Sequence, residues 1–133
     1  MSSRSSVQKT FREELYNIFF SFTSVAGAGA SQTLNTADGR CRGITSIVSN
    51  GTGQYTIVLD EALGPIKNFV GRICETSLQG ALTNANFLSL VSANAATRTI
   101  VLQGRFFGGS TGGITAGAIC NGTITYSTSP VVY

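Results

Sequence analysis

Few side chains in this chain of 133 residues could act as acids, bases or nucleophiles. The sequence contains six acidic residues, three cysteines and no histidine. General acid–base and nucleophilic catalysis need a base positioned beside the reacting group, and histidine supplies it most often. Asp60 and Glu61 are adjacent, so on a strand they would face opposite sides, and Glu75 stands alone. We therefore expect no catalytic residue, no cofactor and no enzymatic activity.

The three cysteines, Cys41, Cys74 and Cys120, form no metal-binding pattern. No C-x-x-C pair occurs, and the chain has no histidine to complete a zinc ligand set. An odd number of cysteines also argues against a disulfide framework. The pattern predicts no metal site and three reduced thiols that behave as small apolar side chains.

Basic residues are spread along the chain, which has a net charge of +3. Nucleic-acid-binding proteins usually gather such residues on one face. The nearest approach to a cluster is the triplet Arg40-Cys41-Arg42. We interpret this triplet as the solvated start of a strand and expect no direct contact with nucleic acid.

An apolar run at residues 15–30 has the composition of either a secretory leader or a first strand. Glu13 and Glu14 precede the run, where a leader carries positive charge. Apolar and polar residues alternate along it with a period of two, which predicts a half-buried strand over residues 16–25. The run is too short and too polar to cross a bilayer, so we expect no membrane partner.

Two segments of the chain are nearly identical. Residues 46–59 read SIVSNGTGQYTIVL and residues 89–102 read SLVSANAATRTIVL, with seven of fourteen positions identical and no gap. Asn-Gly-Thr-Gly at residues 50–53 is a hairpin turn signal, and the corresponding turn is expected at residues 93–96. We expect each copy to form a hairpin with one apolar face, and the two hairpins to cover each other.

Further strands are expected near the end of the chain and after Pro65. Proline cannot join the interior of a ladder, so a strand should follow it over residues 66–75. The last two strands are predicted at residues 114–120 and 123–127, joined by a hairpin turn at Asn121-Gly122.

These elements predict an all-β fold without long helices. Glycine, serine and threonine are abundant and charged residues make up only 11% of the chain, a composition that suits strands and tight turns better than helices. We expect a single β-sandwich or jelly-roll-like domain of about eight strands over residues 14–133, preceded by an N-terminal arm over residues 1–13.

The predicted first hairpin, GITSIVSNGTGQYTIVL at residues 43–59, resembles a recurrent segment in small virion proteins of tailed bacteriophages. The strand RTIVLQ at residues 98–103 and the start FREELYNIFF are similar to the same family. The resemblance covers about residues 10–107. It implies a structural protein of the virion, first of all a head decoration (cement) protein at the capsid surface. Such proteins are compact β folds, often homotrimers, that bind where subunits of the major capsid protein meet and strengthen the shell.

Three regions are expected to contact neighbouring subunits. Basic residues of the arm would reach acidic patches, the loops at residues 50–53 and 108–113 would touch the capsid or face outward, and a pair of aromatic residues would anchor an interface. An alternative for that pair is one ring in the core and one partly exposed. The predicted contact residues are Arg4, Lys9, Arg12, Asn50, Gly51, Phe106 and Phe107.

Three other functions are compatible with the sequence. A tail- or fibre-associated receptor-binding module would carry its function on loops, although four tyrosines and no tryptophan are few for sugar recognition. A secreted bacterial β-domain would use residues 1–30 as a leader. A small β-barrel enzyme is the most distant alternative, because candidate catalytic groups are few.

Overall fold

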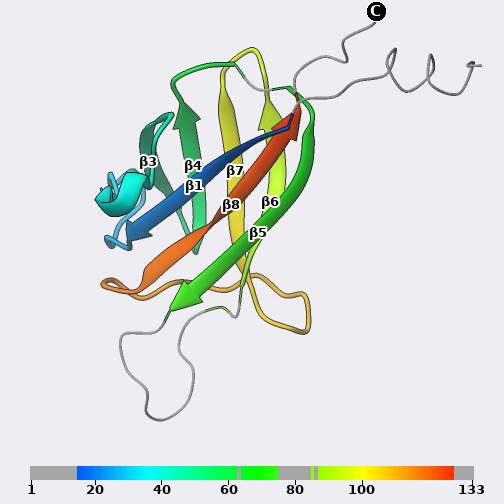
Figure 1. Ribbon diagram of the computed structural model, residues 1–133. Coiled ribbons are helices and arrows are strands. Elements are labelled where there is room, and N and C mark those ends of the chain that lie inside the picture. The colour runs from blue at the N-terminus through cyan, green and yellow to red at the C-terminus, as the bar shows by residue number, and fades with distance from the viewer. Residues whose placement is uncertain (1–14, 63, 75–84, 86, 128–133) are drawn as a thin grey trace, which may run out of the picture.

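The computed structural model describes residues 15–62, 64–74, 85 and 87–127, and these form one all-β domain (Figure 1). The described residues contain no α-helix, and a single 3-10 turn, η1, spans Ala37–Gly39. The strands are β1 (Leu15–Thr23), β2 (Thr33–Leu34), β3 (Ile44–Gly51), β4 (Gln54–Leu59), β5 (Ile66–Cys74), β6 (Phe87–Asn94), β7 (Thr99–Arg105) and β8 (Ile119–Ser127). The predicted arm at residues 1–13 lies outside the described residues.

The strands form one antiparallel sheet in the order β2-β1-β8-β5-β6-β7-β4-β3. In Figure 1, β1, β8 and β5 form a near wall that crosses in front of β3, β4, β7 and β6. The expected fold class, an all-β single domain, is therefore confirmed, but the sheet curls on itself in a barrel-like form and does not split into the two sheets of a sandwich.

The segment of residues 29–34 brings the two ends of the sheet together. Ser49 in β3 donates its backbone N–H to Ala30 O (2.9 Å) and accepts one from Gly29 (2.7 Å), while Gln32 N–H donates to Ile47 O (2.8 Å). Directly afterwards β2 pairs with β1, with Leu34 opposite Phe22. One short segment thus satisfies backbone groups of β3 at one end of the sheet and of β1 at the other, which would otherwise be open to pairing with other chains.

The two similar segments lie side by side in the sheet. The prediction that the two hairpins cover each other face to face is therefore wrong. Their return strands β4 and β7 pair with each other, and Ile57 lies opposite Ile100, its equivalent in the other copy. The pairing therefore has an approximate two-fold symmetry about this residue pair. The outgoing strands differ in register, because Ser46 pairs with Val58 whereas its equivalent Ser89 pairs with Gln103.

The second turn lies at residues 95–98, two residues later than the sequence predicted. The Asn94 side chain explains the difference, because its Oδ1 accepts hydrogen bonds from the backbone N–H groups of Ala96 (3.0 Å) and Thr97 (3.2 Å). Asparagine forms such turns readily through its own side chain. A bulge between Leu90 and Ser92 then absorbs the change of register.

Apolar side chains fill the interior of the sheet. Phe20 and Phe22 of β1 are almost completely buried, as the alternation in the sequence predicted. A row of rings crosses the core, with centroid separations of 6.0 Å for Phe69–Phe20, 6.4 Å for Phe20–Phe22 and 4.9 Å for Phe22–Tyr55. The other fully buried large side chains include Ile47, Ile57, Leu59, Ile100, Leu102 and Ile124.

Strand β8 is continuous through Asn121-Gly122, so the hairpin predicted at this dipeptide is wrong. Gly122 lies between Phe20 on β1 and Gly71 on β5. A Cβ added at Gly122 would approach Val70 O to 2.0 Å and the Phe20 ring to 2.8 Å. Glycine is needed here for the close approach of a ring and a carbonyl, not for a turn.

The sheet is incompletely paired between β5 and β6. Only Gly71 and Arg72 of β5 pair with β6, at Leu88 and Phe87. Beyond these pairs the strands diverge, and the core side chains Ile66, Phe69 and Leu90 are only partly buried. This opening leaves apolar surface accessible on one side of the domain.

Replacing Ile100 by aspartate should prevent folding, because Ile100 is 0% exposed at the centre of the β4–β7 pair. An unpaired carboxylate there costs on the order of 5 kcal/mol, close to the whole stability of a small domain, about 5–15 kcal/mol. Circular dichroism and urea titration measure the effect, with Thr97→Asp in the exposed turn as control. A soluble Ile100→Asp protein that unfolds cooperatively would contradict this placement.

Gly122→Ala should lower the free energy of unfolding by about 1–3 kcal/mol, because the new methyl group would overpack the contact with Phe20 and Val70. Urea denaturation measures the change. Gly108→Ala is the matched control, since a Cβ at Gly108 would meet nothing within 4 Å, and it should have little effect. Equal stability of both variants would show that the packing around Gly122 is loose.

Candidate functional site: a basic and aromatic groove

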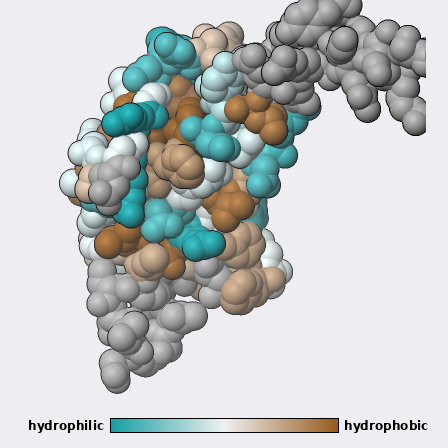
Figure 2. All heavy atoms as spheres, viewed as in Figure 1, coloured by the Kyte–Doolittle hydropathy of each residue, from teal (hydrophilic) through white to brown (hydrophobic). Residues whose placement is uncertain are grey.

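A row of exposed side chains crosses the outer face of the layer formed by β1, β8 and β5. Phe19 on β1 and Val70 on β5 both pair with Thr123 on β8, so the three residues are lateral neighbours. Phe19 is 54% exposed and Val70 is 43% exposed. Figure 2 shows apolar side chains among polar ones on this face. Large exposed apolar side chains in a group are typical of contact surfaces.

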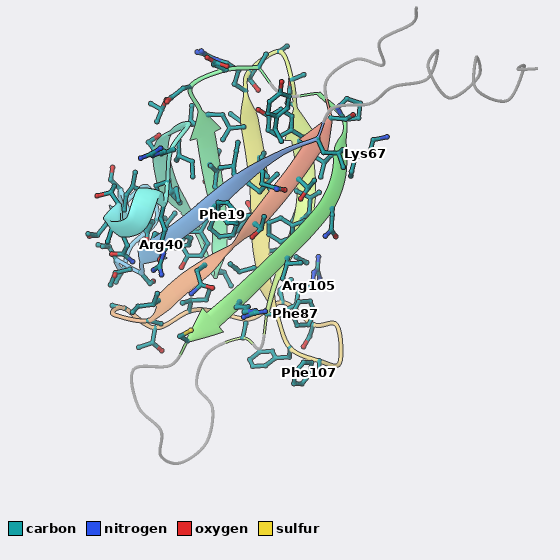
Figure 3. All side chains as sticks on the ribbon, in the orientation of Figure 1. Phe19, Arg40, Lys67, Phe87, Arg105 and Phe107 are labelled. Carbon is teal, nitrogen blue, oxygen red and sulfur yellow. The ribbon has the colours of Figure 1, made fainter. Side chains whose placement is uncertain are left out.

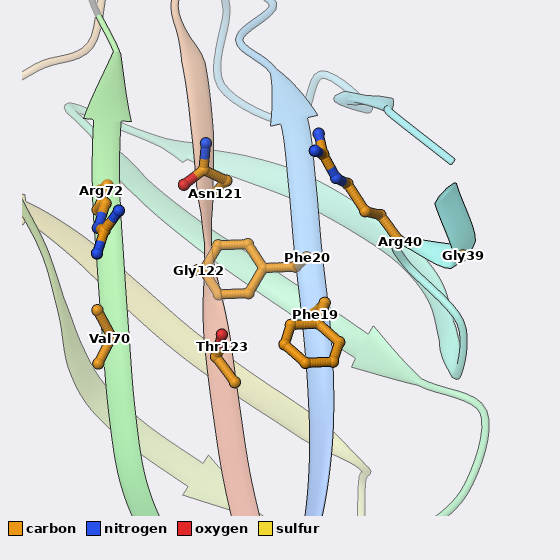
Figure 4. A pocket seen from close by; sticks show the side chains of 9 residues that line it. All are labelled: Phe19, Phe20, Gly39, Arg40, Val70, Arg72, Asn121, Gly122 and Thr123. Carbon is orange, nitrogen blue, oxygen red and sulfur yellow. The ribbon is translucent and has the colours of Figure 1, made fainter. Parts of the chain in front are cut away.

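Arginine side chains border this row on both sides. A shallow groove of about 450 Å³ is lined by Phe19, Arg40, Val70, Arg72, Asn121 and Thr123, together with Phe20, Gly39 and Gly122 (Figure 4). We call this the basic-aromatic groove. A second hollow on the other side of Phe19 is lined by Asn17, Gly39 and Arg42. Phe19 therefore projects between two hollows, one lined by Arg40 and Arg72 and the other by Arg42.

The other two described arginines, Arg98 and Arg105, use their side chains for hydrogen bonds within the domain. Arg98 donates to Asp60 O (2.8 Å), and Arg105 donates to Ser89 Oγ (2.8 Å) and Gly109 O (3.1 Å). In the described part of the chain, no hydrogen bond or ion pair engages the side chains of Arg40, Arg42 and Arg72. These groups remain available to an external anion, which a guanidinium binds in bidentate fashion when the anion is a carboxylate.

Cys41 holds the two neighbouring arginines beside Phe19. Its backbone N–H donates to Phe19 O (2.7 Å), and its thiol donates to Ser21 O (3.2 Å) and accepts from Ser21 N (3.3 Å). Cys41 is buried and has a φ of 63°, a conformation that few non-glycine residues adopt. Because the buried cysteine is tied to β1, Arg40 and Arg42 on either side of it remain exposed.

The sequence-predicted loop residues come together at one end of the domain. The loops at residues 50–53 and 108–113 touch, since a Cβ on Gly53 would lie 2.0 Å from Gly112 O. Asn50 is exposed, and its Nδ2 donates to Gln54 Oε1 (3.1 Å) and Thr56 Oγ1 (2.8 Å). Gly51 forms the turn with a φ of 96°. These residues hold the hairpin together and lie apart from the basic-aromatic groove.

The predicted aromatic pair is divided between two environments. Phe106 is partly buried, and its ring lies so close to Gly112 that an added Cβ there would approach it to 2.5 Å. Phe107 is 83% exposed, and its ring stacks on Phe87 with centroids 6.1 Å apart (Figure 3). This arrangement agrees with the alternative prediction for the pair, in which one ring is packed inside the domain and the other is exposed. Arg4, Lys9 and Arg12 lie outside the described residues.

Neither Phe19 nor Arg72 was among the contact residues predicted from the sequence. Phe19 points outward from β1, whereas the residues on either side of it, Ile18 and Phe20, are buried. The alternation itself therefore marks Phe19 as an exposed aromatic residue. Arg72 is outward on β5, but its nearness to Phe19 depends on the pairing of β1 and β5 with β8. Local sequence carries no information about that pairing.

The cysteines do not all behave as predicted. All three are free, and Cys41 and Cys120 are buried, but Cys74 is exposed. Burial raises the pKa of the Cys120 thiol to about 12, so this group stays protonated at neutral pH. Burial also raises the pKa of Tyr55, against the opposing effect of its hydrogen bond with Ser24. Among the described residues, no three acidic, cysteine or histidine side chains gather in one place.

No helix in the described part of the chain has the length and apolar character needed to cross a membrane. Comparison with known proteins finds no family model, curated protein or solved structure that matches this chain.

Thiol labelling should distinguish Cys74 from the two buried cysteines. At pH 7.5 a maleimide should react rapidly with Cys74 and reach Cys41 and Cys120 only after unfolding, because both buried thiols are inaccessible to the reagent and the raised pKa of Cys120 also keeps that thiol protonated. Mass spectrometry of the labelled protein measures the reaction, and Cys74→Ser should abolish the rapid phase. Rapid labelling of Cys120 in the native protein would contradict its burial.

Proposed function

We propose that this protein is a structural component of a tailed-phage particle, most specifically a head decoration protein that binds between subunits of the major capsid protein and stabilises the shell. It acts by contact alone, as a homotrimer at the capsid surface, and catalyses no reaction. Burial of surface across subunit boundaries raises the free energy needed to separate the subunits.

The observation that carries this proposal is the contrast between the interior and the outer face. The interior of the described domain is filled mainly by apolar side chains. The outer face nevertheless exposes Phe19, Val70 and Phe107, and aromatic and arginine side chains are enriched at protein interfaces. Such a surface suits a protein that is largely covered by its neighbours.

The segments that resemble phage virion proteins support the same proposal. Two of them fall on the hairpin β3–β4 and on β7, which are joined through the central Ile57–Ile100 pair, and the described part of the third, FREELYNIFF, lies in β1. The hairpin β3–β4 and β7 form one continuous block of the sheet. The opening between β5 and β6, with its partly exposed apolar side chains, offers a further surface for contact between copies.

Copy number in purified particles tests the proposed function. A decoration protein should give a stained band comparable in molar amount with that of the major capsid protein, and the purified chain should bind particles that lack it. A minor band would favour the fibre or receptor-binding alternative, and absence from particles would contradict both proposals.

Deletion of residues 1–13 tests the predicted arm separately. The truncated chain should retain the circular dichroism spectrum of the full chain and bind particles more weakly, because Arg4, Lys9 and Arg12 would be missing. Unchanged binding would remove the arm from the contact surface.

A further inference from the structure

We propose that the basic-aromatic groove receives an extended acidic segment of the major capsid protein, in which carboxylates flank an apolar side chain. This inference rests on the proposed function and deepens it by assigning the contact to a face of the domain and the partner to a chemical class.

Charge is the first argument for this partner. Arg40 and Arg72 line the groove that Phe19 borders, Arg42 lines the hollow on its other side, and the described residues that line the two hollows include no acid. Only 11% of the chain is charged, so three arginines around one exposed ring are a marked local concentration. Asp60, by contrast, lies at the end of β4, where its backbone and side-chain oxygens accept hydrogen bonds from Arg98 and Thr45. The described lining of the groove therefore supplies no counter-charge to the arginines and is complementary to an acidic partner.

The apolar floor of the groove is the second argument. Phe19 and Val70 lie two strands apart with Thr123 between them, a separation of about 10 Å at the usual strand spacing. An inorganic anion or an isolated carboxylate would leave these side chains uncovered. A peptide that carries an apolar side chain would cover them and remove apolar area from water.

Spacing along the strands sets the pattern of the ligand. Arg72 follows Val70 by two residues on the outward face of β5, which is about 7 Å along a strand. An extended peptide has the same two-residue repeat. A segment of the form acid–x–apolar–x–acid would thus place its apolar side chain against Phe19 and Val70, with one carboxylate at Arg72 and the other toward Arg40 and Arg42.

An acidic peptide fits this groove better than nucleic acid does. Single strands are usually held by several aromatic rings on which successive bases stack, whereas the groove contains one exposed ring, Phe19, beside the aliphatic Val70. The phosphate backbone would still be attracted to the arginines, so an oligonucleotide belongs in the test as a competing ligand.

The test compares charge reversal inside and outside the groove in the full-length chain. Arg40→Glu/Arg72→Glu should weaken binding to particles at least 100-fold, because two attractive contacts become repulsive, and Phe19→Ala should weaken it at least 10-fold. Lys67→Glu/Arg98→Glu makes the same change in net charge on exposed residues that do not line the groove, and it should alter binding less than threefold. All the changed side chains are exposed, and circular dichroism with thermal unfolding checks that each variant folds.

A peptide with the repeating pattern Glu-Ser-Leu-Ser provides a direct probe, because in an extended chain its glutamates and leucines share one face. It should bind the wild-type chain more tightly than the same peptide with lysine in place of glutamate or a single-stranded oligonucleotide of equal length, and Arg40→Glu/Arg72→Glu should abolish its binding. If the wild-type chain binds particles and the groove variant binds equally well, the inference is wrong while the proposed function stands. If the wild-type chain does not bind particles, the proposed function fails and the inference falls with it. Tighter binding of the oligonucleotide would also overturn the inference.

Discussion

Residues 29–34 close the sheet on itself and thereby determine which side chains face the core. This segment donates to and accepts from β3 and then pairs with β1, so both ends of an eight-stranded sheet are satisfied by one short stretch of chain. A curled sheet has a single inner face, and the alternation of side chains along each strand then divides the residues cleanly into core and surface. The aromatic row through Phe69, Phe20, Phe22 and Tyr55 fills that inner face, and glycines at positions 71 and 122 make room for it.

The same division leaves the outer face free to carry residues that would be costly inside. Phe19 is exposed between two buried neighbours, and Arg72 lies across the groove from it only because β1 and β5 both pair with β8. Cys41 contributes from a different element, since its hydrogen bonds to β1 place Arg40 and Arg42 next to the same ring. Three separate parts of the chain thus meet around one exposed aromatic side chain. This convergence supports our proposal of function by contact with an acidic neighbour.

Much of the fold could be predicted from local sequence, and most of the candidate site could not. Alternation identified β1, the turn glycines identified the hairpin β3–β4, and the strand after Pro65 begins at Ile66. Local patterns failed where a residue serves a distant neighbour: Gly122 resembles a turn residue but accommodates Phe20, and Asn94 moves the second turn through its own side chain. The groove depends on strand order, which brings Phe19 and Arg72 together across β8. The order of strands is set by the closed sheet as a whole, so no local pattern reveals it.

An electron-microscopy map of the intact particle, at a resolution that shows side chains, would test the proposed contact directly. We expect this fold on the outside of the shell, with Phe19 and Arg72 buried against an acidic strand of a capsid subunit and the filled interior of the sheet unchanged. A map that lacks the protein, or that shows the basic-aromatic groove facing solvent while another face contacts the capsid, would contradict the proposed contact.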